Sequence, residues 1–124
     1  AGSFSGSFNG GSGIDTLTIT GGGNTISLAN ITGVELIDLT GTGNNTLSNV
    51  TVDNLANNSG LYVRGNVGDK VNVAGQGLIE PVEGFTNTGK TTTNEHDAKD
   101  TSVYNVWTDT AGHMLYIDQD INVI

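Results

Sequence analysis

The chain runs Gly10-Gly11-Ser12-Gly13-Ile14-Asp15-Thr16-Leu17-Thr18-Ile19-Thr20, a glycine-rich turn that leads directly into an alternating segment. Glycine adopts positive φ at low cost, so the first residues predict a tight turn. The alternation of Leu17 and Ile19 with threonine predicts a strand buried on one face. Asp15 lies where the turn meets the strand. A carboxylate in such a turn suits a calcium ion, which binds carboxylate, carbonyl and water oxygens together.

The charge of the chain favours the same interpretation. Its 124 residues include 13 Asp and Glu but only 4 Lys and Arg, which gives a net charge of -9 and an isoelectric point near 4.1. Most carboxylates therefore lack a basic partner and are either dispersed in water or gathered around a cation. Because a metal-free form would repel itself, we expect folding to depend on Ca2+.

Length and composition indicate one domain that spans residues 1–124. Hydrophobic residues make up 35% of the chain and charged residues 14%, with many Gly, Thr, Asn and Ser residues between them. This composition is typical of short strands joined by many turns. The absence of cysteine excludes disulfides and thiolate metal sites.

Two classes of partner are not expected. Nucleic-acid binding requires clustered basic residues, whereas Arg64, Lys70, Lys90 and Lys99 are scattered along the chain. The sequence has no apolar stretch of about 18 residues, so membrane insertion is not expected. No basic segment precedes an apolar one, so no cleavable leader is expected either.

Apolar residues recur at period two, with turn-forming clusters between them, at intervals of roughly ten residues over most of the first 75. This rhythm predicts an all-β fold of two packed sheets of short strands. The sheets form either a β-sandwich or a short β-solenoid-like stack, and periodicity alone leaves both open. The apolar positions are Leu17/Ile19, Ile26/Leu28, Leu36 with Leu39, Leu47, Leu61/Val63 and Val71/Val73.

Two segments depart from this rhythm. Residues 51–55 predict a single helical turn with Thr51 as its N-cap, and a strand from Leu47 to Val52 is the alternative. Residues 84–102 are polar and rich in Thr and Asn, and they predict a long surface loop or an insertion site.

The C-terminal part predicts an antiparallel hairpin that closes the fold. Segments 103–107 and 114–117 alternate in character on either side of a turn at 109–112. If the second strand continues to the C-terminus, Asp118 and Asp120 share its polar face. Two like charges on one strand face are either solvated or bridged by a cation, and solvent exposure is the favoured alternative.

Several segments together resemble a known family. Gly10 to Asp15 matches the GGxGxD calcium-turn pattern of the repeats-in-toxin (RTX) proteins. Residues 33–47, with the sequence GVELIDLTGTGNNTL, resemble a domain of the giant adhesins that Gram-negative bacteria export by type I secretion, as do residues 68–73, 104–107 and 115–123. Only one GGxGxD copy is present, so the chain is not a tandem array of nonapeptide repeats.

The resemblance implies a calcium-stabilised all-β module in the ligand-binding or extender region of an RTX adhesin, at the bacterial cell surface. Such modules extend the adhesin or display a binding domain inserted into a loop, and thereby support adhesion and biofilm formation. The expected partners are neighbouring domains of the same adhesin and a surface glycan or protein ligand. The module itself is expected to be a monomer, and its specific ligand is not inherited from the family.

Six carboxylates are candidate calcium ligands because they lie at glycine-rich turns or on the last strand. Asp15, Asp38 and Asp69 each border such a turn, and Glu35 lies three residues before Asp38. The alternative for the aspartates is an Asx turn, in which the carboxylate accepts hydrogen bonds from nearby backbone amides. The full set is Asp15, Glu35, Asp38, Asp69, Asp118 and Asp120.

No catalytic site is expected. Residues 84–91 match the GxxxxGK[ST] pattern of phosphate-binding loops, but Pro81 interrupts the approach and no helix-forming segment follows. His96 and His113 lie in a loop and a turn, and no GxSxG elbow supplies a nucleophile. For the cluster Glu95-His96-Asp97, a solvated loop is favoured over a transition-metal site.

The sequence therefore predicts a noncatalytic, calcium-dependent structural or display module. The alternative is a module that itself binds a glycan or surface ligand through the 84–102 loop or through Tyr104, Trp107 and Tyr116 of the hairpin. For these aromatics, packing in the core or on the sheet surface is favoured over a sugar-stacking platform. An accessory module of a polysaccharide-modifying enzyme is disfavoured, because the net charge of -9 repels acidic polysaccharides.

Overall fold

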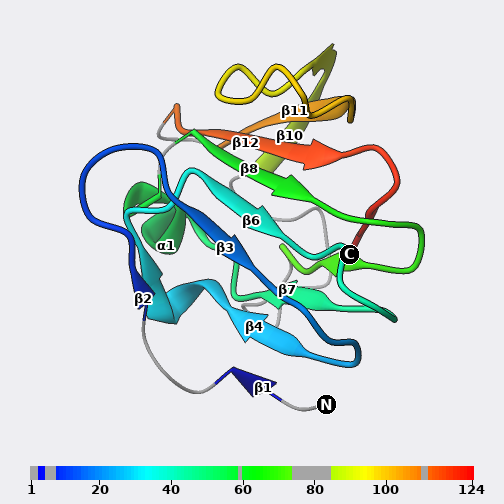
Figure 1. The fold of residues 1–124 in the computed structure, drawn as a ribbon. Coiled ribbons are helices and arrows are strands. Elements are labelled where there is room, and N and C mark those ends of the chain that lie inside the picture. The colour runs from blue at the N-terminus through cyan, green and yellow to red at the C-terminus, as the bar shows by residue number, and fades with distance from the viewer. Residues whose placement is uncertain (1–2, 5–7, 59, 74–84, 110–111) are drawn as a thin grey trace.

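The protein winds in successive coils of short strands, so that strands far apart in the sequence lie side by side (Figure 1). The computed structural model describes residues 3–4, 8–58, 60–73, 85–109 and 112–124. Over these residues strands predominate and the helical elements are a few residues long. The prediction of an all-β fold is confirmed.

Two sheets form the long sides of the coils. In the five-stranded sheet every neighbouring pair is parallel, in the order β1 (Ser3–Phe4), β4 (Thr25–Ser27), β7 (Thr46–Ser48), β9 (Lys70–Val71) and β13 (Asn122–Val123). The six-stranded sheet begins with four parallel strands, β3 (Thr16–Thr18), β6 (Leu36–Asp38), β8 (Leu61–Arg64) and β12 (Met114–Asp118). It ends with two antiparallel strands, β11 (Tyr104–Asp109) and β10 (Phe85–Thr92).

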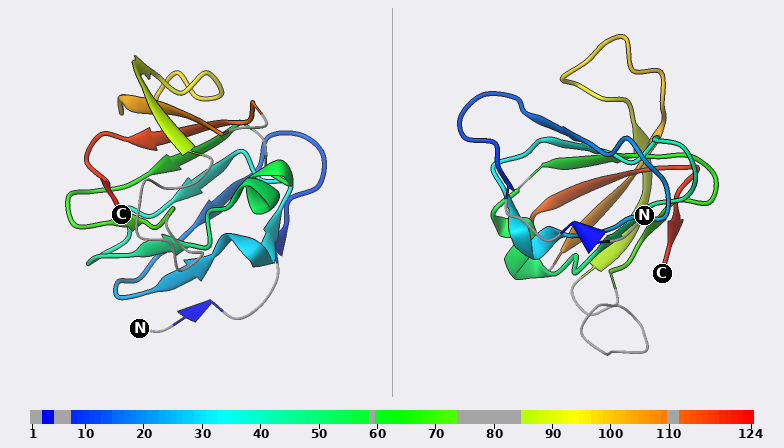
Figure 2. Two further views of the ribbon diagram at one scale, coloured as in Figure 1. Left: turned by 180° about the vertical axis from the view of Figure 1, so that it is seen from behind. Right: turned by 60° about the horizontal axis from the view of Figure 1, so that its bottom comes forward.

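A shorter third side lies between the two sheets (Figure 2). There β2 (Phe8–Asn9) pairs in parallel with β5 (Ile31–Thr32), which follows the short 3-10 helix η1 (Leu28–Asn30). In the next coil this place is taken by helix α1 (Val52–Ala56). Thr51 caps α1 by accepting a hydrogen bond from the Asn54 N–H at 3.1 Å. The predicted helical turn is confirmed, and β7 ends before it, at Ser48.

The pairing register measures the length of a coil. Thr25 pairs with Ser3, 22 positions earlier, and with Thr46, 21 positions later. Each of these coils contributes one strand to each of the two long sheets, which explains the strand spacing of roughly ten residues in the sequence. Lys70 and Asn122 pair although they lie 52 positions apart, because β10, β11 and the residues around them are inserted into that coil. Parallel pairing that repeats every 21 or 22 residues is typical of a stack of coils, whereas a meandering sandwich pairs its strands antiparallel.

The interior of the coils holds the main hydrophobic core. Residues that pair across parallel strands point to the same side of a sheet, so Ile37, Val63 and Ile117 stack in one ladder and are fully buried. Trp107 and Leu17 pack against the margin of this core. The core residues are Ile26, Leu28, Ile31, Val34, Ile37, Leu39, Leu47, Val50, Leu55, Leu61, Val63, Val71, Val73, Leu115, Ile117 and Ile121.

Side-chain carbonyls connect the coils where the strands end and the backbone amides lose their ladder partners. Asn45 Oδ1 accepts the Asn24 N–H of the preceding coil at 3.1 Å. Asn58 Oδ1 likewise accepts the Val34 N–H at 3.0 Å, and Asn58 Nδ2 donates to the Ile31 carbonyl at 2.7 Å. Asn45 and Asn58 are buried, and these bonds satisfy polar groups that water cannot reach.

The predictions for the C-terminal half are confirmed in part. The hairpin of β11 and β12 is present and antiparallel. The prediction of a loop at 84–102 was wrong for residues 85–92, which form β10 because they extend the sheet beside β11. The last strand does not run on to the C-terminus, since β12 ends at Asp118 and a turn precedes β13. Gly84 lies outside the described residues.

Two further observations bear on motifs of the sequence. The segment that matches the phosphate-loop pattern is a strand over residues 85–91, and no helix follows it within the described residues. None of the helices among those residues has the length and apolar character needed to cross a membrane.

Replacing Ile26 with alanine is expected to lower the free energy of unfolding by about 2–5 kcal/mol, because Ile26 is fully buried between stacked coils. Thr25→Ala on the same strand is the matched control, with an expected change within about 0.5 kcal/mol, since Thr25 is exposed. Urea unfolding measures both. Equal effects of the two substitutions would contradict the assignment of Ile26 to the interior.

Candidate functional site

The outer face of the six-stranded sheet carries an apolar cluster that is separate from the interior core. Leu36, Tyr62 and Tyr104 are buried there, and Tyr116 packs against them. The Tyr62 and Tyr116 rings stack with centroids 4.3 Å apart, and Tyr104 meets Tyr62 edge-on at 5.2 Å. Because the outward face of a coil is otherwise in contact with water, a cluster buried on this face requires a cover.

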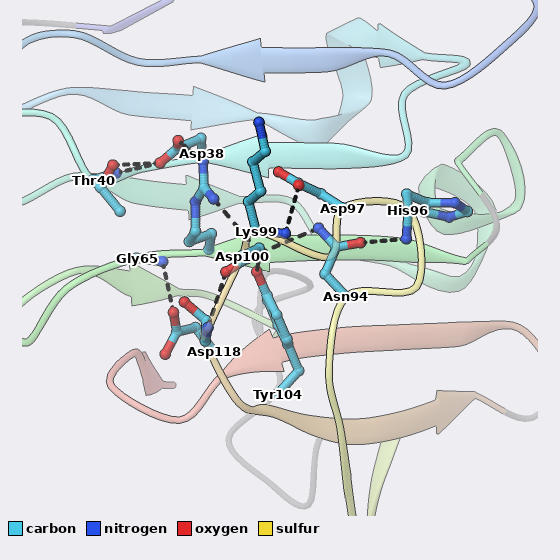
Figure 3. A network of polar contacts seen from close by, with 12 residues as sticks. Asp38, Thr40, Gly65, Asn94, His96, Asp97, Lys99, Asp100, Tyr104 and Asp118 are labelled. Carbon is cyan, nitrogen blue, oxygen red and sulfur yellow. Dashed lines mark hydrogen bonds and ion pairs between the residues drawn. The ribbon is translucent and has the colours of Figure 1, made fainter.

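Residues 93–103, named here the outer loop, contribute to this cover. The loop leaves β10 at Thr92 and enters β11 at Tyr104, and these two residues pair with each other. The His96 ring lies edge-on to Tyr62, with ring centroids 5.6 Å apart. The outer loop therefore rests against the sheet over β8 instead of projecting freely (Figure 3).

Asp100 closes the neck of the outer loop. Its Oδ2 accepts hydrogen bonds from the Tyr104 hydroxyl and, at 3.2 Å, from Asn94 Nδ2. Its Oδ1 accepts the Ser102 N–H at 3.0 Å. Asn94 and Asp100 are both buried, whereas residues 95–99 between them are exposed. The loop thus has a fixed base and a solvent-exposed tip.

Arg64 connects this neck to the stacked coils. Its Nη2 lies 2.5 Å from Asp38 Oδ2, and its Nη1 lies 3.6 Å from Asp100 Oδ2. Asp38 Oδ1 also accepts hydrogen bonds from the hydroxyl and the N–H of Thr40, at 2.6 and 2.9 Å. Because both aspartates are buried, Arg64 supplies the opposite charge that such carboxylates require. Asp38 is therefore engaged by Arg64 and Thr40.

The two aspartates have altered acidities. Burial raises the pKa of each, but hydrogen bonds outweigh burial and lower the net pKa below its usual value. Those bonds come from Arg64 and Thr40 at Asp38, and chiefly from Tyr104 at Asp100. Burial, together with the bond to Asp100, raises the pKa of Tyr104, so its hydroxyl remains protonated and donates.

The Gly10–Asp15 turn is the second candidate site. Glu35 of the next coil accepts the Asp15 N–H at its Oε1, at 2.8 Å. Asp15 Oδ2 is buried and has no hydrogen-bond partner. A Cβ added to Gly10 would lie 3.0 Å from this oxygen and 2.3 Å from the carbonyl oxygen of Gly33, so only glycine fits there. The turn brings Asp15 and Glu35 together with a backbone carbonyl.

Asp69 lies in a different place, inside the turn between β8 and β9, and is fully buried. Its Oδ1 accepts the Asn45 N–H and its Oδ2 accepts the Asn66 N–H, each at 2.7 Å. The first bond continues the series in which Asn45 accepts the Asn24 N–H one coil earlier. Asp69 therefore accepts hydrogen bonds from backbone amides, which was the alternative to binding a metal ion.

Asp118 and Asp120 do not share an exposed strand face. Asp118 is 4% exposed and accepts hydrogen bonds from the N–H groups of Gly65, at 3.4 Å, and Asp120, at 3.0 Å. The prediction that Asp118 is solvent-exposed was wrong, because the chain turns after β12 and folds over this carboxylate. Asp120 is exposed.

Within the part of the chain that the structure describes, no three His, Cys, Asp or Glu side chains gather as a group that could hold a metal ion. A cation at the Gly10–Asp15 turn would need backbone carbonyls and water besides Asp15 and Glu35. Calcium accepts such ligands, since it takes six to eight oxygens of mixed origin. The buried free oxygen of Asp15 and the Gly33 carbonyl therefore fit a hard cation.

The remaining candidates have packing roles. His113 Nδ1 lies 2.7 Å from Asp109 Oδ2, which ties the hairpin turn together. His96 lies against Tyr62. Tyr104 is buried under the outer loop, and Trp107 packs on the interior core. The prediction that the hairpin aromatics fill the core or the sheet surface is confirmed for these two residues.

The neck of the outer loop has no distinctive sequence pattern. Asp100 and Asn94 belong to a polar segment whose composition is that of any surface loop, and the contact of Asp100 with Arg64 joins residues distant in sequence. The available signal was the alternation in strand 61–64, where Tyr62 and Arg64 point away from the core. An arginine and a tyrosine on the same outward face suit a partner that supplies a carboxylate or an aromatic ring.

Comparison of the chain with protein-family models, curated proteins and solved structures finds no match. The function is therefore inferred from the geometry of the outer loop and of the Gly10–Asp15 turn.

Acid is expected to destabilise the protein through Asp38 and Asp100. Because their folded-state pKa is lowered, their contribution is complete above the unfolded pKa and is lost as pH falls below about 4. The free energy of unfolding, measured by urea titration from pH 7 downward, should fall less steeply in this range for the double variant D38N/D100N. Glu95→Gln, at an exposed position, should keep the steep fall. Identical slopes for all three proteins would contradict this origin of acid sensitivity.

Proposed function

We propose that the chain is a noncatalytic, calcium-dependent display module of an extracellular bacterial adhesin of the RTX type. The observation that carries the proposal is the buried Asp15 Oδ2 atom, which has no hydrogen-bond partner. The Gly33 carbonyl oxygen lies at the same turn. A buried carboxylate oxygen without a hydrogen bond is costly, and a cation that binds only the folded state offsets that cost. The resemblance of several segments to adhesin modules supports the same assignment.

Asp15 and Glu35 would hold the ion, together with the Gly33 carbonyl and water. Asp15 belongs to the first coil and Glu35 to the second, and their strands are neighbours in the six-stranded sheet. Calcium, when bound, would neutralise the two carboxylates. The protein would then gain rigidity after export to a calcium-rich medium. Asp38, Asp69 and Asp118 each already accept hydrogen bonds, so the proposed site is limited to the turn.

Calcium at about 100 times its dissociation constant should add about 2.7 kcal/mol to the free energy of unfolding. Thermal and urea unfolding in calcium and in chelator would measure this difference. Asp15→Asn should abolish it, because the amide removes the charge that binds the ion, while the matched control Asp53→Asn, exposed on α1, should keep it. Equal stability of the unmodified protein with and without calcium would refute the proposed metal dependence.

The display role is supported by the construction of the outer loop. Asp100 joins the two ends of the loop through Asn94 and Tyr104, and Arg64 joins this neck to the coils. Residues 95–99 beyond the neck are exposed, and His96 lies against Tyr62 of the sheet. A sequence inserted at the tip would leave the core and the neck unchanged. Such a site suits the presentation of a binding segment.

A small folded domain inserted between Asp97 and Ala98 should leave the melting temperature of the module within a few degrees of the original value. The same insertion in an Asp100→Ala background should lower the melting temperature further than the substitution alone, because the neck no longer isolates the tip. Calorimetry of the four proteins measures this coupling. Unfolding of the module on insertion at the tip would contradict the display role.

The second candidate function is direct binding of a glycan or protein by the outer loop. It is favoured by the rigid anchoring of an exposed tip that carries Glu95, Asp97 and Lys99. The insertion separates the two functions, since it interrupts the tip and should abolish direct binding to a glycan array. A module that only displays other domains shows no such binding before or after the insertion.

A further inference from the structure

The two ends of the stack of coils differ in construction. At one end, the six-stranded sheet finishes in the antiparallel strands β11 and β10. The pairing of β10 shifts register between Asn87 and Thr91, and its exposed stretch carries Lys90. Antiparallel closure, an irregular edge and a lysine are the features by which natural sheets prevent further strands from adding.

The other end has none of these features among the described residues. Strands β1, β2 and β3, all in the first coil, are each the terminal strand of their sheet. Strand β3 has the sequence Thr16-Leu17-Thr18, with neither a charge nor a proline. Asp15 is the only charged side chain before Glu35, although the whole chain has a net charge of -9. The first coil is therefore an edge with Asp15 as its one charged side chain.

The backbone of β3 shows which groups are open. Ile19 donates its N–H to the Asp38 carbonyl at 2.9 Å, and Asp15 accepts the Leu36 N–H at 3.2 Å. Because backbone groups point alternately to the two sides of a strand, Thr16 and Thr18 direct theirs away from β6. They are in register with Leu36 and Asp38, whose backbone groups β6 presents to β3.

The interior ladder is truncated at the same edge. Leu17 pairs with Ile37, which pairs with Val63, and Val63 with Ile117. The last three are fully buried, whereas Leu17 is only partly buried, as are Phe8 and Ile19 of the first coil. The difference follows from position, since a residue in an inner coil is covered on both sides and Leu17 on one.

We infer that the β1–β2–β3 edge is a docking surface for a further coil of parallel β-solenoid. Three features define this partner: a strand parallel to β3, an aliphatic side chain opposite Leu17, and uncharged residues facing outward. The contacts of β3 with β6, of β6 with β8 and of β8 with β12 have the first two features. A second copy of this chain would present β10 or the short β13 at its opposite end, and neither continues the parallel ladder of β3.

The inference rests on the proposed function in one respect: the further coil is supplied by a neighbouring segment of the adhesin. The strand pairs that define the edge include neither Asp15 nor Glu35, the two proposed calcium ligands. A test performed both in calcium and in chelator therefore separates failure of the calcium site from failure of the docking surface.

The test extends the full chain with a duplicate of residues 3–24 placed before Ser3, which keeps the 22-residue register of Ser3 and Thr25. Hydrogen exchange of the native Thr16 and Thr18 amides should slow by about tenfold or more, because they gain ladder partners. The control extension carries Leu17→Asp and Ile19→Asp in the duplicate only, and should leave exchange unchanged.

Unchanged exchange with the intact duplicate, or equal slowing with both extensions, would overturn the inference. Analytical ultracentrifugation of the unextended chain tests whether a second copy of the chain binds this edge instead. Self-association that slows exchange at Thr16 and Thr18, and that a Thr18→Lys variant abolishes, would assign the edge to a second copy and also overturn it. A monomer with fast exchange at these two amides is the expected starting state.

Discussion

The structure depends on parallel stacking of coils in register. Each coil places its aliphatic residues directly on those of the coil before, as Ile37, Val63 and Ile117 do, and burial on both sides stabilises them. The turns between strands would leave amides without partners, and Asn45, Asn58 and Asp69 supply acceptors from the following coil. The glycine-rich composition follows, because coils this close leave no room for side chains at several turns.

Among the described residues, the large exception to this repeat is the insertion that contains β10, the outer loop and β11. β9 and β13 remain paired across the 52 positions that include this insertion, so the stack continues as if the insertion were absent. A second apolar cluster and the Arg64, Asp38 and Asp100 interactions then fix the insertion to the outside of the sheet. The rigid stack and the anchored tip together give the chain the form of a support that presents a surface segment.

Charge is distributed unevenly over this support, and the distribution has structural consequences. The first coil carries Asp15 alone, while the remaining acidic residues follow in the sequence from Glu35 onward. Carboxylates that are buried in the later coils have donors in the protein, as Asp69 does. The Asp15 oxygen does not, and it lies at the turn whose glycine pattern resembles a calcium site.

Local sequence patterns were enough to predict the all-β class, the helical turn at Thr51, the hairpin of β11 and β12, and the glycine turn at Gly10–Asp15, because period-two alternation, capping and glycine turns are local properties. They could not distinguish a sandwich from stacked coils, since both have the same strand rhythm and differ only in which distant strands pair. Three features appear only in the folded chain: Asp38 meets Arg64, residues 85–92 are a strand, and the outer loop lies against Tyr62. Each of these depends on contacts between residues far apart in sequence, which no local pattern specifies.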